Sequence, residues 1–147
     1  MFLNFIEADC SVADFVLKGD DDILLNPKIV SKIILNNGVN NSTSSNCPFL
    51  WGCKKYDEPI RNPASKYYIP ELIWPEEAGK YPPYFSGACY LLSGSVAIAM
   101  AKVQKSVSIF PLDDVYIGIL LEKLNLTRCM STGTYFYQNY LKYSKLL

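Results

Sequence analysis

Histidine is absent from this 147-residue chain, which excludes catalytic triads and zinc sites that depend on an imidazole. The 14 lysines and arginines equal the 14 carboxylates in number and form no basic run, so nothing predicts a nucleic-acid-binding surface. No segment reaches the roughly 18 consecutive apolar residues of a membrane span, and the first ten residues lack the basic start of a signal peptide. We therefore expect neither nucleic-acid binding nor histidine-dependent catalysis.

Five cysteines are scattered along the chain, and none forms a Cys-x-x-Cys pair. In a reducing compartment they would be small core residues, whereas in a secretory compartment they could form two disulfides whose pairing the sequence leaves open. The hydrophobic fraction of 50% and the aromatic fraction of 14% are typical of a folded chain. We expect one domain over residues 1–147, with a polar Asn/Ser-rich loop near residues 36–46.

Apolar, strand-prone segments alternate with segments of helical pattern, which predicts the α/β class. Strands are expected at residues 13–18, 49–53 and 88–92, and helices at 26–35, 93–105 and 115–124. Residues 57–83 are rich in Pro and Tyr and predict an ordered, aromatic-lined loop. In this loop, Trp74 either stacks on a ligand ring or anchors the loop. Residues 134–140 are expected to form a last strand or an edge segment.

Three consecutive aspartates, Asp20 to Asp22, follow an apolar segment. Adjacent carboxylates oppose each other's ionisation unless a cation or hydrogen-bond donors lie among them. The carboxyl end of a strand is also where open α/β sheets bind ligands. An EF-hand is excluded because Leu25 and Ser31 stand where its loop requires Gly and Glu. The two hypotheses left are a divalent cation held by Asp20 and Asp22 next to a phosphate-bearing ligand, and a solvated acidic turn.

Four blocks, in order, resemble the β1,3-galactosyltransferase and β1,3-N-acetylglucosaminyltransferase family, glycosyltransferase family 31. The first is Phe15-Val-Leu-Lys-Gly-Asp-Asp-Asp-Ile-Leu-Leu-Asn26. The second runs from Arg61 through Ser-Lys-Tyr-Tyr at residues 65–68 to Tyr-Pro-Pro-Tyr-Phe-Ser-Gly at 81–87. The third and fourth are Tyr-Leu-Leu-Ser at 90–93 and Leu-Asp-Asp-Val-Tyr-Ile-Gly at 112–118. The resemblance implies a partial GT-A domain, a Rossmann-like fold of nucleotide-diphospho-sugar transferases.

The resemblance also implies roles for individual residues. Asp22 and Asp20 would hold Mn²⁺ or Mg²⁺, and Asp20, Asp21 and Gly87 would lie in the binding site for a UDP-sugar donor. Asp114 would be the general base that takes the proton of the acceptor hydroxyl. The rival interpretation makes Asp113 or Asp114 the N-cap of the following helix; with the resemblance, we expect Asp113 to be the cap and Asp114 the base.

The implied activity is inverting, metal-dependent transfer of galactose or an N-acetylhexosamine from a UDP-sugar to a glycan, in β1,3 linkage. Complete members of the family have strands upstream of the triplet, a late metal-binding His and an N-terminal membrane anchor in the Golgi. Here only residues 1–19 precede the triplet, and no His is present. We therefore expect a fragment or truncated product of a Golgi type II enzyme. The alternative is a non-catalytic relative that binds glycan or a partner glycosyltransferase.

Overall fold

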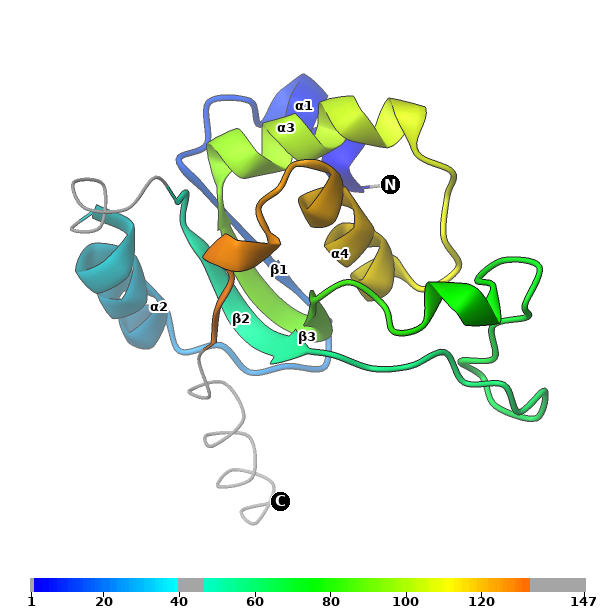
Figure 1. Ribbon diagram of the computed structural model, residues 1–147. Coiled ribbons are helices and arrows are strands. Elements are labelled where there is room, and N and C mark those ends of the chain that lie inside the picture. Colours follow the sequence, from blue (N-terminus) through cyan, green and yellow to red (C-terminus); the bar gives the residue numbers. More distant parts are fainter. Residues whose placement is uncertain (1, 40–46, 133–147) are drawn as a thin grey trace, which may run out of the picture.

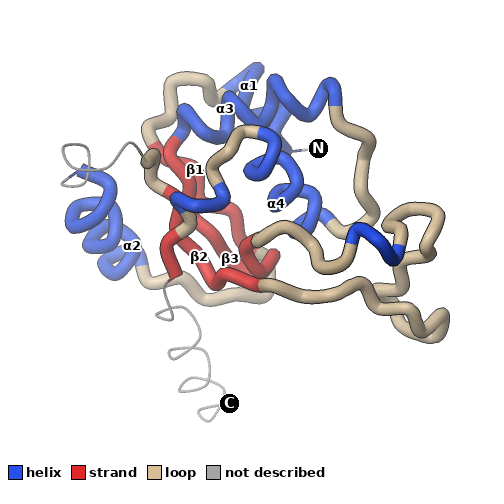
Figure 2. The backbone as a smooth tube through the Cα atoms, in the orientation of Figure 1, coloured by secondary structure: helices blue, strands red, loops and turns tan. Residues whose placement is uncertain are grey.

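The computed structural model describes residues 2–39 and 47–132. In this part of the chain, four strands form one sheet in the order β1-β3-β2-β4. The strands are β1 (Phe15–Gly19), β2 (Leu50–Lys55), β3 (Tyr84–Ser93) and β4 (Ser131–Thr132). β3 pairs antiparallel with both β1 and β2 (Figures 1 and 2). β4 pairs parallel with β2. The sheet is thus mixed, with β3 at its centre.

Four α-helices surround this sheet in the described part of the chain. They are α1 (Phe2–Asp9), α2 (Pro27–Ile33), α3 (Gly94–Val103) and α4 (Asp113–Lys123). A π-helical segment (Ile34–Val39) continues α2, and short 3₁₀ turns occur at Glu76–Ala78, Gln104–Ser106 and Thr127–Cys129. The long segment between β2 and β3 otherwise has no regular structure (Figure 2).

The two faces of the sheet bury different side chains, because successive residues of a strand point to opposite sides. On one face Leu92, Tyr90 and Leu50 join the larger core beneath α1, α3 and α4. On the other face Leu91 and Trp51 pack with α2 in a smaller core. The result is two helical layers with the sheet between them, which confirms the α/β class. The finer GT-A assignment and the single-domain assignment stay predictions.

Local sequence signals account for several element boundaries. The Asn26 side chain accepts a hydrogen bond of 3.0 Å from the Lys28 N–H, so α2 begins at the predicted cap with Pro27 at its first position. The prediction for α4 is wrong in one respect: the N-cap position is Leu112, and Asp113 lies in the first turn of the helix. A carboxylate there still interacts favourably with the positive helix end.

Other differences concern the ends of the chain and of β3. α1 was not predicted, and β3 begins at Tyr84, four residues before the expected strand. The predicted edge segment at 134–140 lies outside the described residues, as do positions 40–46 of the predicted polar loop. No helix in the described ranges is both long and apolar enough to span a membrane.

A disulfide joins Cys47, just before β2, to Cys129, just before β4. It crosses 82 positions of sequence and fixes the segment that β4 adds to the sheet. Cys10, Cys53 and Cys89 carry free thiols. Burial raises the pKa of the Cys89 thiol to about 11, so this cysteine is a core residue and a poor nucleophile at neutral pH. One of the two possible bridges is therefore present among the described residues.

Candidate functional site

A bulge in β3 organises the candidate site. Gly52 of β2 pairs with Tyr90, but Lys54 pairs with Phe85, so a step of two residues along β2 matches a step of five along β3. Bulges of this kind bend a strand and re-aim its groups. The bulged residues include Gly87, and the end of β1 docks beside them through a 3.0 Å hydrogen bond from the Asp20 N–H to the Ala88 carbonyl.

Lys18, near the end of β1, reaches into this bulge. Its ammonium donates a hydrogen bond to the carbonyl oxygen of Gly87 and lies 2.8 Å from Asp20 Oδ1. It also lies 3.8 Å from Asp113 Oδ2, so one side chain contacts the end of β1, the bulge of β3 and the start of α4. The hydrogen bond between Lys18 and Gly87 joins residues that are 69 positions apart in the sequence.

Gly87 faces the same point from β3. A β-carbon placed on it would lie 3.5 Å from Asp114 Cβ, 3.6 Å from Lys18 Nζ and 3.8 Å from Asp114 Oδ2. These are ordinary contact distances, so neither packing nor a positive φ demands glycine here. The missing side chain leaves room beside the Asp114 carboxylate.

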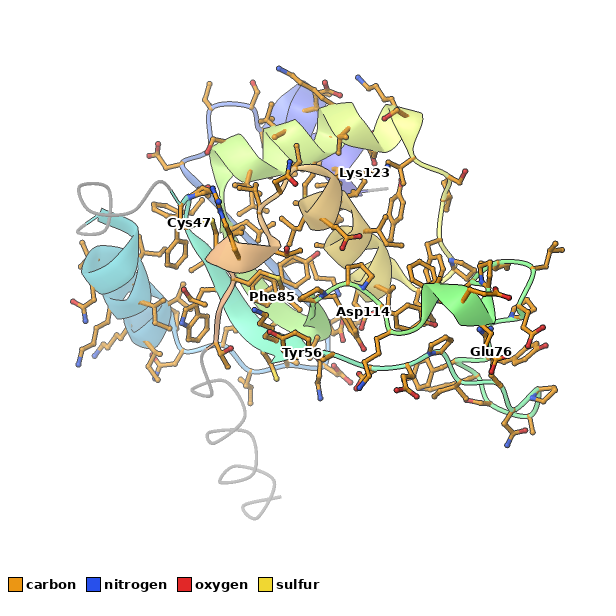
Figure 3. The ribbon with its side chains drawn as sticks, viewed as in Figure 1. Cys47, Tyr56, Glu76, Phe85, Asp114 and Lys123 are labelled. Atoms are coloured by element: carbon orange, nitrogen blue, oxygen red, sulfur yellow. A yellow bond between two sulfur atoms is a disulfide. The ribbon has the colours of Figure 1, made fainter. Side chains whose placement is uncertain are left out.

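Asp114 lies at the start of α4, beside the strand that carries Phe85 (Figure 3). Its Oδ1 accepts a hydrogen bond of 2.8 Å from the Val115 N–H. Burial raises the pKa of the Asp114 carboxyl above its ordinary value of 3.8; the Val115 N–H acts against that rise and the neighbouring Asp113 carboxylate adds to it. A half-buried carboxylate with a raised pKa is better matched to proton abstraction near neutral pH than a solvated one.

Aromatic side chains and Arg61 fix the long loop between β2 and β3. Trp74 packs edge-on against Tyr81 and Phe110, and its Nε1 donates a 2.9 Å hydrogen bond to the Gly79 carbonyl. Of the two hypotheses for Trp74, the structure supports the loop anchor. Arg61 serves the same loop, since its guanidinium donates to the carbonyls of Ile69 and Trp74 at 2.7 and 2.6 Å.

The two tyrosines of the Tyr-Pro-Pro-Tyr block belong to the same aromatic cluster: Tyr81 packs against both Trp74 and Tyr84. The Tyr84 hydroxyl donates a hydrogen bond of 2.6 Å to Asp57 Oδ2. The Tyr81 side chain is 5% exposed, and its hydroxyl has no hydrogen-bond partner among the described residues. Tyr90 is a core residue, as expected, with 1% of its surface exposed.

The structure brings three of the predicted site residues to the bulge of β3: Asp20 pairs with Lys18, Lys18 bonds to Gly87, and Asp114 lies beside Gly87. Asp21 and Asp22 are exposed in the turn that follows Asp20. That Asp22 faces Asp114 across a pocket stays a prediction. Sequence reasoning missed Lys18 as a site residue, although its place two residues before the triplet was a usable signal.

The carboxylates of Asp20 and Asp22 are hard oxygen donors, which suit Mn²⁺ or Mg²⁺. Within residues 2–39 and 47–132, however, no three Cys, Asp or Glu side chains are grouped so that they could hold a metal ion. The pair on this turn fits part of a coordination shell, and Mg²⁺ sites commonly complete such a shell with substrate phosphates and water.

Comparisons with a family model and with individual known proteins point to the same family. The family model described as "Galactosyltransferase" matches residues 1–131. The chain is 35% identical over 126 residues to mouse N-acetyllactosaminide β-1,3-N-acetylglucosaminyltransferase 2, covering 86% of this chain and 30% of that protein. It is 35% identical over 127 residues to human β-1,3-galactosyltransferase 5, covering 86% and 38% respectively.

A third relative is rat UDP-GlcNAc:betaGal β-1,3-N-acetylglucosaminyltransferase 7, which is 32% identical over 125 residues, with 85% of this chain and 30% of the relative covered. The matched region thus spans between 30% and 38% of the length of these three relatives. The comparison covers all three segments that meet at Lys18, because the family model extends from residue 1 to residue 131.

Proposed function

This chain belongs to the galactosyltransferase family, and from that premise we propose that it acts in the transfer of a hexose from a UDP-sugar to a glycan. The transferred sugar is galactose or an N-acetylhexosamine, and the bond formed is a β1,3 linkage. The names of the relatives support this class, since they are β1,3-N-acetylglucosaminyl- and β1,3-galactosyltransferases. The observation that carries the proposal is the meeting of three segments at the β3 bulge: Lys18 contacts Asp20, Asp113 and Gly87, and Asp114 lies beside Gly87.

The acidic turn after β1 is the proposed donor side of the site. Asp20 and Asp22 would hold Mn²⁺ or Mg²⁺, with Asp21 beside them, and the bound ion would neutralise charge on the leaving diphosphate. The bulge at Gly87 lets a ligand approach the backbone closely, because no side chain fills the space next to Asp114.

Asp114 is the proposed general base. The acceptor hydroxyl oxygen forms a bond to the anomeric carbon of the donor while the bond from that carbon to the UDP oxygen breaks. The hydroxyl proton passes to the Asp114 carboxylate, and the electron pair of the broken bond leaves with UDP. A single displacement of this kind inverts the anomeric centre. The hydrogen bond from the Val115 N–H holds the carboxylate in place, and its raised pKa favours acceptance of a proton.

The proposed compartment is the Golgi lumen, with the protein held at the membrane. The disulfide between Cys47 and Cys129 supports a location in the secretory pathway, because disulfides persist in oxidising compartments and are rare in the cytosol.

The second candidate is a non-catalytic protein that binds glycan or a partner glycosyltransferase. It is favoured by one observation: the described residues supply no group of three metal ligands. The two candidates share the family and the site but differ in turnover.

A donor screen separates them. The purified chain is incubated with Mn²⁺, with radiolabelled UDP-galactose, UDP-GlcNAc or UDP-GalNAc, and with acceptors that end in β-galactose or β-GlcNAc. The proposal expects transfer from one donor, and NMR of the product should show a β1,3 bond. Binding of the same acceptors without any transfer would support the second candidate. Absence of both binding and transfer would contradict the first candidate and the glycan-binding form of the second.

A further inference from the structure

Lys18 lies between two acidic segments that are far apart in the sequence. Residues 20–22 carry three carboxylates, and residues 113–114 carry two more. Among the residues that the structure describes, no other lysine or arginine forms an ion pair with either segment. Two segments of like charge repel each other when the sheet and α4 bring them together, and an ammonium between them opposes that repulsion.

The environment of Lys18 differs from that of an ordinary surface lysine. Its side chain is 18% exposed, whereas Lys80 and Lys105 are 65% and 64% exposed in their own ion pairs. Exposed pairs contribute little to stability because water and salt screen them. The partly buried bond from Lys18 to the Gly87 carbonyl further ties the ammonium to the β3 bulge, so its position is set by the backbone of the central strand.

We propose that Lys18 is a positioning residue that fixes the distance between the donor-binding turn and Asp114. The inference rests on the proposed function, which gives these two elements their roles. Lys18 itself does not touch the reacting atoms; it acts by holding Asp20 and the start of α4 against the bulge. Transfer requires donor and base to be aligned, and a misplacement of about 1 Å lowers a rate by about 100-fold.

The kinetic arm compares three variants of the full chain with the wild type. Lys18→Met keeps a long side chain without the charge, Lys18→Arg restores the charge, and Lys105→Met is the matched control that breaks an exposed pair with Glu7. With Mn²⁺ and whichever of UDP-GlcNAc and UDP-galactose is the better donor, Lys18→Met should lower kcat by about 10- to 100-fold. The donor KM should stay within about threefold, since removing alignment affects the chemical step more than binding. Lys18→Arg should recover most of the lost kcat, and Lys105→Met should have no effect.

The second arm is independent of turnover. Amide hydrogen exchange is measured at two hydrogen bonds on either side of Lys18, from the Asp20 N–H to Ala88 and from the Tyr116 N–H to Leu112. If Lys18 holds both elements, both amides should exchange at least about tenfold faster in Lys18→Met. The buried amides of β3 should be unchanged, and Lys105→Met should leave both reporters unaffected.

Faster exchange together with a selective loss of kcat supports the proposal. Unchanged exchange in Lys18→Met would overturn it, because the two elements would then be held without Lys18. Faster exchange with normal kcat would also overturn it, since Lys18 would be a purely structural residue. Failure of the wild type to transfer any donor is a different result: it removes the proposed function, and the inference about catalysis with it.

Discussion

Gly87 and Asp114 face each other across a space that one methyl group would fill: a β-carbon on Gly87 would lie 3.5 Å from Asp114 Cβ. The space adjoins a half-buried carboxylate and a lysine ammonium, and no backbone requirement keeps it empty. A substitution that fills this space can therefore affect ligand binding without disturbing the fold.

Gly87→Ala should fold normally and lose transfer. The added methyl group meets only ordinary contacts, and the loss of backbone freedom in the unfolded chain should raise the free energy of unfolding by about 0.4 to 1 kcal/mol. Transfer should fall at least about tenfold, because the methyl group occupies the space next to the base. Urea unfolding and initial rates measure the two effects.

The matched control is Gly118→Ala in α4. A β-carbon there would come within 2.6 Å of Tyr84 Cβ and 2.9 Å of the Pro83 carbonyl, so this variant should lose roughly 1–3 kcal/mol of stability through overpacking. Normal transfer by Gly87→Ala would show that the space takes no part in binding.

Asp114→Asn tests the general base. The amide keeps the shape of the side chain and can still accept the Val115 hydrogen bond. The free energy of unfolding should therefore match the wild type below pH 3.8, the ordinary pKa of the group, and be somewhat higher than the wild type above the raised pKa of the carboxyl, because the half-buried charge is gone. The proton acceptor is lost, and kcat should fall by about 10²- to 10⁴-fold. Calorimetry should show that UDP and Mn²⁺ bind as in the wild type, since that affinity is assigned to Asp20 and Asp22.

Two controls accompany this variant. Asp113→Asn removes the carboxylate through which α4 pairs with Lys18 and should lower kcat by no more than Lys18→Met does, whereas Asp22→Asn should abolish the joint binding of UDP and Mn²⁺. Near-normal turnover by Asp114→Asn would remove the assignment of the base. UDP and Mn²⁺ binding that survives Asp22→Asn would remove the assignment of the metal site.

Stability and activity should depend on pH in opposite directions because of Asp114. Burial raises the pKa of this carboxyl in the folded chain above its ordinary value of 3.8. At pH values between 3.8, the ordinary pKa that applies in the unfolded chain, and the higher pKa of the folded chain, the folded chain binds more protons than the unfolded chain. The contribution of Asp114 to the free energy of unfolding therefore falls as pH rises. The base works only when deprotonated, so kcat should rise as pH rises through the same raised pKa.

Urea unfolding and initial rates from about pH 4 to pH 7 measure both slopes, and Asp114→Asn provides the reference. Subtracting the variant's curve from that of the wild type isolates the contribution of Asp114. A difference curve in which stability rises with pH would mean that the folded chain lowers the pKa of Asp114, contrary to the burial of its carboxyl.

Cys47→Ser tests the disulfide to Cys129. A bridge across 82 positions restricts the unfolded chain strongly, so its loss should lower the free energy of unfolding by about 2 to 5 kcal/mol. Reduction of the wild type with dithiothreitol should have a similar effect in a urea titration. Cys53→Ser, which removes a free thiol, is the control and should be nearly neutral; equal losses in both variants would argue against the bridge.

The sequence was sufficient where a structure depends on near neighbours. Asn26 and Pro27 predicted the start of α2, because a cap and its helix are adjacent in the chain. The C-terminal half of β3, residues 88–92, was predicted by its apolar residues. The first residues of β3 were not predicted, because they belong to the strand only through pairing with β2 beyond the bulge. The cap of α4 was placed one residue too late, because the true cap is Leu112, whose side chain cannot bond the helix N–H groups, and the adjacent Asp113 is a favoured cap residue by type.

The candidate site was predicted in its residues but not in its organisation. The triplet stood out by its charge and its place after an apolar strand, and Gly87 and Asp114 stood out because of resemblance to a family. The place of Lys18 beside the triplet could have marked the residue, but its role depends on a bulge that brings it to a carbonyl 69 positions away, and a local pattern does not encode that contact. The helix α1 was missed for a different reason: its eight residues carry neither an acidic first turn nor a basic last turn to mark its ends.

The two cores on either side of the sheet have a practical consequence. The chain has two tryptophans; Trp74 packs against the larger core and Trp51 lies in the smaller one. Each layer thus carries its own tryptophan, and replacing either one with Phe leaves tryptophan emission, excited selectively over tyrosine, from the other layer alone. Comparison of the two single-tryptophan proteins during denaturation would reveal whether the layers melt as one cooperative unit or in succession.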